Sequence, residues 1–491
     1  MGEAVSLSRQ HDVARALRAF LPSRAVLFEE EDTRPYECDG LTAYRQLPMV
    51  VALPETEEQV QRILRTCASL GVPVVPRGAG TGLSGGALPP GDGVLLSMAK
   101  FMRVLRLDPR ARVAVVQPGV RNAVISEVAA PHGLYYAPDP SSQIACTIGG
   151  NVAENSGGVH CLKYGLTLHN VLRIRGLTID GEALEIGSEA ADAPGLDLLA
   201  LAIGSEGMLF VVTEVAVKLL PKPRCAQVIM ASFDDVEKAG NAVAAVIAAG
   251  IIPAGLEMMD KPATAAVEQF VAAGYDLDAA AILLCESDGT VEEVAHEIAR
   301  MQAVLQAAGA VRITVSRDEA ERLRFWSGRK AAFPAVGRIS PDYYCMDGTI
   351  PRKRLGEVLN FIAEMERKYG LRCPNVFHAG DGNLHPLILF DANNPEELER
   401  TEQFAGEVLE KCVAVGGTIT GEHGVGVEKI NQMCAQFGTA ELELFHAVKR
   451  AFDPRGLLNP GKAVPTLARC AEYGRMHVRG GKLAHPDLPR F

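Results

Sequence analysis

The spacing of hydrophobic residues in the first 221 positions predicts a β-rich fold with a few helices. Residues 8–21 repeat with helical period, whereas 49–53 form a strand-like apolar run. A helix is predicted from 54–58 onward, because proline stands in its first turn and acidic residues complement the helix dipole; Gly71 ends it. Further strands are predicted at 72–75, 94–97, 113–117, 171–178 and 208–219.

After the Pro221-Lys222-Pro223 segment the pattern changes to an alternation of strands and helices. Strands are predicted at 227–233, 254–259, 280–286 and up to about Gly348. Helices are predicted at 239–249, 263–272, 291–308, 318–333, 351–369 and 395–415. This alternation predicts an α+β layered domain. We therefore predict domains at 1–221 and 222–451, with a turn-rich tail at 452–491 that returns to the first domain.

Two short segments of the second domain carry candidate metal chemistry. Residues 376–377 and 386–390 read as strands joined by a Gly-Asp-Gly turn, which lets His378 and His385 converge. The glycine-rich stretch 416–429 carries Glu422 and His423 side by side. Two histidines and a carboxylate predict an open site for Zn²⁺ or Mn²⁺ rather than Mg²⁺, which prefers oxygen ligands. The alternative is that both histidines merely complete a hairpin.

Glycine-rich loops in the first half indicate a nucleotide site of an unusual kind. Residues 80–85 spell GxGxxG after a strand, yet no helix is predicted to follow, so a Rossmann site is excluded. The exposed amides of this loop can still hold a diphosphate. Similar small-residue stretches at 138–158 and 204–207 would suit a long dinucleotide such as FAD, or could be tight turns only.

Composition and charge exclude several classes of function. The net charge of -11 and the lack of a basic stripe argue against nucleic-acid binding. No CxxC pattern occurs among the 11 cysteines, so an iron–sulfur cluster would have to be on a partner. The longest apolar run is too short to span a membrane. Dispersed thiols and the lack of a signal segment predict a cytoplasmic protein.

Several motifs, in this order, resemble one flavoprotein family. The motifs are PRGAGTGLSGGA, PDPSSQIACTIGGNVAENSGG, HAGDGNLH with GEHGVG, and FDPRGLLNPGK. Over about residues 45–465 the chain is similar to the FAD-linked 2-hydroxyacid dehydrogenases of the vanillyl-alcohol-oxidase-like family. FWSGRK, KINQMCAQF and AEYGRMHV narrow the resemblance to the FAD-binding subunits of bacterial glycolate oxidases. The resemblance implies a two-subdomain FAD-binding domain of the vanillyl-alcohol-oxidase/PCMH type, followed by an α+β FAD-linked oxidase C-terminal (substrate) domain.

The resemblance also assigns roles to residues. It implies the metal ligands His378, His385 and Glu422, the catalytic base His423, and Arg329 for the substrate carboxylate. Thr81 stands where covalently flavinylated relatives have histidine, so the FAD is expected to be non-covalent. The implied FAD-binding residues are Pro76, Arg77, Gly78, Gly80, Thr81, Gly82, Ser84, Gly85, Pro138, Asp139, Ser141, Thr147, Gly149, Gly150, Asn151, Asn155, Gly157, Gly158 and Asn459.

The implied activity is oxidation of a short 2-hydroxy acid, glycolate to glyoxylate or D-lactate to pyruvate. Relatives acting on dicarboxylates have a lysine where this chain reads 344–347, which favours a short substrate. Electrons would pass to an iron–sulfur subunit, beside a second flavin-type subunit, in a complex that is cytoplasmic or held at the inner membrane by its partners. The rival hypotheses are a zinc-dependent hydrolase with structural glycine loops and a non-catalytic subunit; the second ranks last because every ligand is present.

Overall fold

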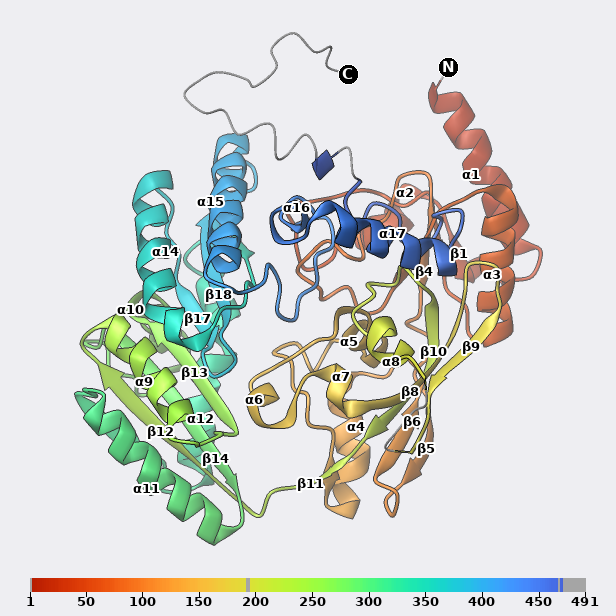
Figure 1. Ribbon diagram of the computed structural model, residues 1–491. Helices are drawn as coiled ribbons and strands as arrows, with labels where there is room; N and C mark the ends of the chain where they lie inside the picture. The colour runs from red at the N-terminus through yellow and green to blue at the C-terminus, as the bar shows by residue number, and fades with distance from the viewer. Residues whose placement is uncertain (1, 191–194, 467–468, 471–491) are drawn as a thin grey trace.

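The computed structural model describes residues 2–190, 195–466 and 469–470. In this part of the chain the first half contains two main sheets, which lie opposite the single large sheet of the second half (Figure 1). No helix of the described residues is long and apolar enough to cross a membrane.

The first sheet, in the order β1-β2-β4-β3, is covered by two N-terminal helices. Its strands are β1 (Val26–Leu27), β2 (Val50–Ala52), β4 (Val94–Ser97) and β3 (Val74–Arg77), and its helices are α1 (Gly2–Arg18) and α3 (Glu57–Leu70). The apolar face of α3 packs into the core through Val60, Ile63 and Leu64, as its helical spacing predicts. Thr56 caps α3, and Gly71 ends it with φ of 62°.

The second sheet is antiparallel, in the order β5-β6-β10-β8-β9. Its strands are β5 (Val104–Asp108), β6 (Val113–Val116), β10 (Val211–Lys218), β8 (Val171–Leu177) and β9 (Ala183–Gly187); the nearby helices are α4 (Asn122–Ala129), α5 (Ile148–Glu154), α6 (Cys161–Tyr164), α7 (Thr167–Asn170) and α8 (Leu198–Ala202). A small pair joins β7 (Leu134–Tyr135) to β11 (Leu220–Pro221). This first half therefore contains two separate main sheets, one for each of two subdomains.

The sheet of the second half is covered by helices on both faces. Its strand order is β15 (Arg312–Val315), β12 (Cys225–Phe233), β14 (Ala281–Gly289), β13 (Gly255–Asp260), β17 (Asn375–His378), β18 (Asn383–Phe390) and β16 (Asp342–Cys345). Side chains alternate between faces: Ile229 and Ala231 pack on one helical layer, and Val228 and Met230 on the other.

The helices divide between these two faces. One layer comprises α9 (Val236–Ala248), α11 (Val291–Ala307), α14 (Leu355–Tyr369) and α15 (Pro395–Ala414); the other comprises α10 (Lys261–Val271), α12 (Glu319–Lys330) and α13 (Ala332–Val336). The fold is thus α+β, as the sequence predicted.

The chain then returns to the first half through α16 (Met433–Gln436) and α17 (Thr439–Phe452) (Figure 1). Leu457 O accepts a hydrogen bond from Val74 N, and Asn459 N donates to Val74 O, both at 2.8 Å. A disulfide joins Cys434 to Cys470. The two cysteines are 36 positions apart, and nothing in the sequence indicated that they pair. The expectation that the cysteines are free thiols was therefore wrong at these two positions.

Two local predictions were also wrong, and two helices were missed. The predicted helix 318–333 is two helices, α12 and α13, because Pro334 has no N–H to donate to the carbonyl of Lys330. The second glycine stretch is not a loop throughout, since Ile148–Glu154 forms α5. Glycine is needed there because a Cβ at Gly149 would lie 2.5 Å from Pro118 Cβ. Helices α4 and α17 were not predicted.

Candidate active site

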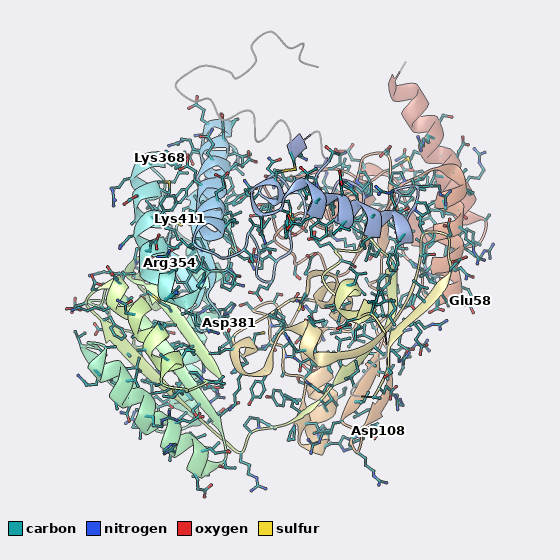
Figure 2. The ribbon with its side chains drawn as sticks, viewed as in Figure 1. Glu58, Asp108, Arg354, Lys368, Asp381 and Lys411 are labelled. Atoms are coloured by element: carbon teal, nitrogen blue, oxygen red, sulfur yellow. A yellow bond between two sulfur atoms is a disulfide. The ribbon has the colours of Figure 1, made fainter. Side chains whose placement is uncertain are left out.

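One cavity of about 540 Å³ runs between the two halves of the chain. At one end it is lined by the loop after β3 and by the N-terminal part of α5, and at the other by the β17–β18 hairpin and the 421–426 loop. The predicted metal ligands and the predicted base therefore lie in the same cavity as the predicted FAD loops. Asp381, in the hairpin turn, is on the side of the second half that faces the first half (Figure 2).

The predicted site residues divide into those that line this cavity and those that do not. Lining residues are Pro76, Arg77, Gly78, Gly80, Thr81, Gly82, Ser141, Thr147, Gly149, Gly150, Asn151, His378, His385, Glu422 and His423. The remaining predicted residues, outside the lining, are Ser84, Gly85, Pro138, Asp139, Asn155, Gly157, Gly158, Arg329 and Asn459. Asn459 supports the cavity wall instead, because its side-chain amide donates to the carbonyls of Gly86 and Glu206.

The three predicted metal ligands converge on one point. Glu422 Oε1 lies 3.2 Å from His378 Nε2 and 3.0 Å from His385 Nε2. Each imidazole is oriented through its other nitrogen: His378 Nδ1 lies 2.8 Å from Glu257 Oε1, and His385 Nδ1 lies 3.2 Å from the carbonyl of Met346. Such partners fix the tautomer that turns Nε2 toward a metal.

A second group of possible ligands shares His385 and comprises Cys345, His385 and His423. Burial raises the pKa of the Cys345 thiol well above its ordinary value, and the thiol donates to the carbonyl of Met346. A thiol held in its protonated form is a poor ligand, because metals bind the thiolate. The set with Glu422 is the better metal site, since its carboxylate has a pKa held well below the ordinary value by His378 and His385 in spite of burial.

Arg329 lies in the layer behind the metal cluster and is tied to it. Its side chain is 1% exposed, and Nε donates to Glu257 Oε2 at 2.7 Å. Glu257 therefore bridges Arg329 and His378, one oxygen to each. Among the described residues Arg329 Nη2 has no hydrogen-bond partner. A buried guanidinium with an unused donor is suited to a carboxylate ligand.

His423 is placed as a neutral imidazole. Its ring stacks on His385, with centroids 4.9 Å apart and planes at 14°. Burial lowers the pKa of His423 to about 4, and His385 adds to this, while Asp347 opposes it. Its Nδ1 is buried with no partner in the described chain. The ring is therefore free to accept a proton near neutral pH.

Two carboxylates that the sequence reasoning missed hold the loop that carries Glu422 and His423. Asp347 Oδ2 accepts hydrogen bonds from the backbone N–H groups of 421, 422 and 423 at 2.7 to 2.9 Å. From the first half of the chain, Glu206 accepts the N–H groups of Val425 and Gly426, both at 2.7 Å. The loop is therefore fixed from both domains at once.

Comparison with known proteins identifies the two domains and the family. Residues 48–187 match the model of an FAD binding domain, and residues 222–463 match that of the C-terminal domain of FAD linked oxidases. The chain is 64% identical to the glycolate oxidase subunit GlcD of Escherichia coli K12 over 479 residues, which is 98% of this chain and 96% of that protein. The chain belongs to the FAD-linked oxidase family. The family resemblance inferred from the motifs is confirmed.

More distant relatives and solved structures extend the match. The family member GlcD of Bacillus subtilis is 38% identical over 88% of this chain and 93% of its own length, and the D-lactate dehydrogenase of Anaerostipes hadrus is 31% identical over 92% and 97%. The fold is that of a p-cresol methylhydroxylase structure with substrate bound, at a TM-score of 0.81, 18% identity and coverage of 94% and 98%. The predicted fold class is confirmed.

The residues of this FAD-linked oxidase fit FAD at the glycine end of the cavity. No helix follows the 80–86 loop, as predicted, and Gly78 lies so close to Thr147 that a Cβ would be 2.5 Å from its Oγ1. Thr147 Oγ1 is buried with no partner among the described residues, as is Asp39 Oδ2 at the same wall. Unpartnered polar atoms in a glycine-walled cavity are what a polar cofactor would satisfy.

Other lining residues were not named among the predicted site residues. They include Asp39, Glu154, Glu206, Lys330, Phe333, Pro334 and Tyr343. Of these, Glu154 and Glu206 lie in the predicted stretches 138–158 and 204–207. Lys330, next to Arg329, is exposed. By contrast, Arg354, Lys368 and Lys411 are on the outer helices and lie away from the cavity (Figure 2). These three cations pair with glutamates of α14 and α15.

Proposed function

We propose that this FAD-linked oxidase oxidises a short 2-hydroxy acid, with glycolate as the preferred substrate and glyoxylate as the product. The observation that carries the proposal is the convergence of the His378–His385–Glu422 cluster and the neutral His423 at one end of the FAD cavity. The buried Arg329 lies behind this cluster and is joined to His378 through Glu257. FAD-dependent hydroxyacid oxidation is common to the relatives named for glycolate and D-lactate. The 64% identity to GlcD favours glycolate over D-lactate.

In the proposed reaction each residue has one task. Arg329 contacts the substrate carboxylate through Nη2, while Glu257 holds the guanidinium in place. The imidazole of His423 accepts the proton of the substrate hydroxyl, which a neutral ring with a pKa of about 4 can do at any pH above that value. Bound FAD supplies the acceptor for the hydride from the substrate carbon. A divalent ion, Zn²⁺ or Mn²⁺, held by His378, His385 and Glu422, would supply Lewis acidity at the hydroxyl oxygen.

The 344–347 segment supports a small substrate. Where a lysine would favour a dicarboxylate, this segment instead contributes buried Tyr344 and Cys345 and the loop-holding Asp347. The lack of a lysine there favours a short acid with one carboxylate, for which Arg329 is the proposed partner.

The electron acceptor is proposed to be on another chain. The relative GlcD is named as a subunit, and this sequence has no cluster-binding cysteine pattern. An iron–sulfur subunit and a second flavin-type subunit would then complete the enzyme, in the cytoplasm or at the inner membrane through those partners. Membership of a flavoprotein family disfavours the zinc-hydrolase alternative, in which the glycine loops are structural only.

A visible spectrum recorded without oxygen tests the proposal. The purified chain should show the two-banded absorbance of oxidised flavin, and glycolate should bleach it with release of one equivalent of glyoxylate. D-lactate should bleach it more slowly, and 2-hydroxyglutarate more slowly still. A spectrum that neither glycolate nor D-lactate changes would overturn the assignment, and hydrolysis of an ester by a colourless protein would favour the alternative.

A further inference from the structure

A second cavity, of about 380 Å³, lies behind the FAD-binding loop. It is enclosed by the segment around Tyr44, the end of the 84–88 loop, β16, α15, the 427–432 segment and Arg469. Its lining residues are Tyr44, Leu88, Tyr344, Glu402, Ala405, Gly406, Leu409, Val427, Glu428, Asn431, Gln432 and Arg469. Within the described chain it has no lining residue in common with the FAD cavity, so it is a separate compartment.

The unusual member of this lining is Glu428. Its side chain is 1% exposed, and neither carboxylate oxygen has a hydrogen-bond partner among the described residues. The nearest cation is Lys429, whose Nζ lies 3.2 Å from Glu428 Oε2. That same Nζ lies 2.6 Å from Asp347 Oδ1 and donates to the carbonyl of Gly424 at 2.8 Å. Lys429 is thus shared between two buried carboxylates, and its shorter contact is to Asp347 rather than to Glu428.

A buried carboxyl whose one short contact is a lysine shared with another carboxylate is costly, so native structures satisfy such groups with further protein donors, water or a ligand. Burial raises the pKa of Glu428 to about 8, even though Lys429 opposes the shift, so at neutral pH the empty site holds a proton there. Asp347 and Asp39, the other acidic groups that act on it, strengthen this effect. A cation entering the cavity would replace that proton and restore the charge balance.

The other walls are also suited to a cation. Tyr44 donates to Glu402 Oε1 at 2.7 Å, and its hydroxyl lies 3.4 Å from that of Tyr344. Burial raises the pKa of both phenols, so they remain neutral and offer oxygen lone pairs and ring faces. The opposite wall is apolar, formed by Leu88, Ala405, Leu409 and Val427. The cavity therefore offers acceptors at one end and room for a short alkyl group at the other.

We propose that this cavity binds a small molecule with a primary ammonium group, with Glu428 as its counter-ion and the tyrosine hydroxyls as further acceptors. An ammonium has three donors and no acceptor, which matches a carboxylate flanked by phenols. Arg469 donates to Asn431 Oδ1 at 2.7 Å at the rim, where it can meet a carboxylate. The ligand is therefore either a simple amine or an amino acid whose carboxylate reaches Arg469, and these two share the ammonium chemistry.

Backbone hydrogen bonds and an ion pair connect this cavity to the active site, so a bound ligand could affect the active site through them. The backbone N–H groups of Val427 and Glu428 donate to Ser84 O in the FAD-binding loop, at 3.0 and 3.1 Å. Lys429 links the same segment to Asp347, which holds the loop of His423. The binding site itself does not depend on the proposed substrate, so its test is separate from the test of the catalytic activity.

Isothermal titration of the FAD-loaded protein tests the proposal. The probes are n-butylammonium and L-alanine, with butyrate as the anionic control, at pH 7 in two buffers of different ionisation enthalpy. We expect saturable binding of an ammonium probe, none of butyrate, and release of about one proton, because Glu428 ionises on binding. Glu428→Gln should weaken binding roughly tenfold or more and abolish proton release. Glu399→Gln, which changes an exposed carboxylate on α15, the helix that forms one wall, but outside the lining, is the matched control.

A second variant keeps the test valid if Glu428→Gln folds poorly. Ala405→Leu places a larger apolar side chain in the cavity wall and should abolish binding while the flavin spectrum stays unchanged. If L-alanine binds more tightly than n-butylammonium and Arg469→Gln removes the difference, the ligand is an amino acid; equal binding indicates a simple amine. Absence of saturable binding for both ammonium probes, or binding that Glu428→Gln leaves intact, overturns the proposal.

Discussion

Glu257 is expected to control metal affinity although it is not itself a ligand. Its two oxygens accept from two donors at once, His378 Nδ1 at 2.8 Å and Arg329 Nε at 2.7 Å, and its side chain is 1% exposed. Burial raises the pKa of Glu257, but the charges of His378 and Arg329 outweigh burial and hold it below its ordinary value. Both partners therefore face an ionised carboxylate.

In Glu257→Gln the side-chain amide has one acceptor atom, its carbonyl oxygen, and one donor group, its NH₂. It can satisfy either His378 or Arg329, but its NH₂ group then opposes the N–H of the other. Removing one partner of a buried ion pair costs about 3–5 kcal/mol, so the variant should unfold at lower temperature. Loss of the group that orients a metal-bound histidine typically weakens metal binding by about 10–100-fold, which is about 1.4–2.7 kcal/mol.

The assay separates these two effects. Metal content is measured after dialysis against a series of buffered free Zn²⁺ and Mn²⁺ concentrations, and thermal unfolding is measured on the same metal-free samples. Glu443→Gln, an exposed glutamate on α17, is the matched control. If Glu257→Gln binds metal within about twofold of the wild type while its flavin spectrum is intact, Glu257 does not orient His378 as argued here.

Four further outcomes are expected. Acid denaturation should release the FAD into solution, because Thr81 offers no histidine for a covalent link; flavin that stays with the precipitate would contradict this. Glu422→Ala should abolish turnover but keep the flavin spectrum, and wild-type rates after chelation would argue against a catalytic metal. His423→Asn should slow flavin reduction by roughly 10²–10⁴ with the loss in kcat more than KM, as stopped-flow measurement would show; a change below about threefold would place the base elsewhere. His160 contacts two carboxylates, with Nδ1 2.7 Å from Asp139 Oδ2 and Nε2 3.2 Å from Glu286 Oε1. Burial lowers the pKa of His160, but these two carboxylates outweigh burial and raise it well above its ordinary value. The stabilisation relative to His160→Gln should be complete below pH of about 6.5 and decline as pH rises through the higher folded pKa, as melting temperatures in a pH series would reveal.

Residues whose signal is local were recognised in the sequence. The hairpin of His378 and His385 follows from a turn in which Gly382 has φ of 80° and a Cβ would lie 2.1 Å from the carbonyl of Ile350, so glycine marks the turn directly. The rejection of a Rossmann site likewise rested on neighbouring residues, and the structure has β4 where a helix would be needed. The catalytic roles of His423 and Arg329 rest on resemblance and stay predictions until they are measured.

Residues whose partners are distant in the sequence were not recognised. Glu257 meets His378 across 121 positions, Asp347 meets His423 across 76, and Glu206 meets Gly426 across 220. Nothing near these carboxylates distinguishes them from the other acidic residues of an acidic chain. Only the fold shows which N–H group or cation each carboxylate binds and holds in place.

The hydrogen bonds and ion pairs of these carboxylates explain how the active site accommodates several buried negative charges. Glu422 is a predicted metal ligand, whereas Asp347, Glu206 and Glu257 accept hydrogen bonds from backbone N–H groups or from cations. Each of these three carboxylates has at least two short donors, which offsets the cost of its burial. Glu428 is buried to the same degree but lacks such donors among the described residues. Glu428 shares its one short contact, Lys429, with Asp347, and this difference from the other three carboxylates is the reason for proposing a ligand at the second cavity.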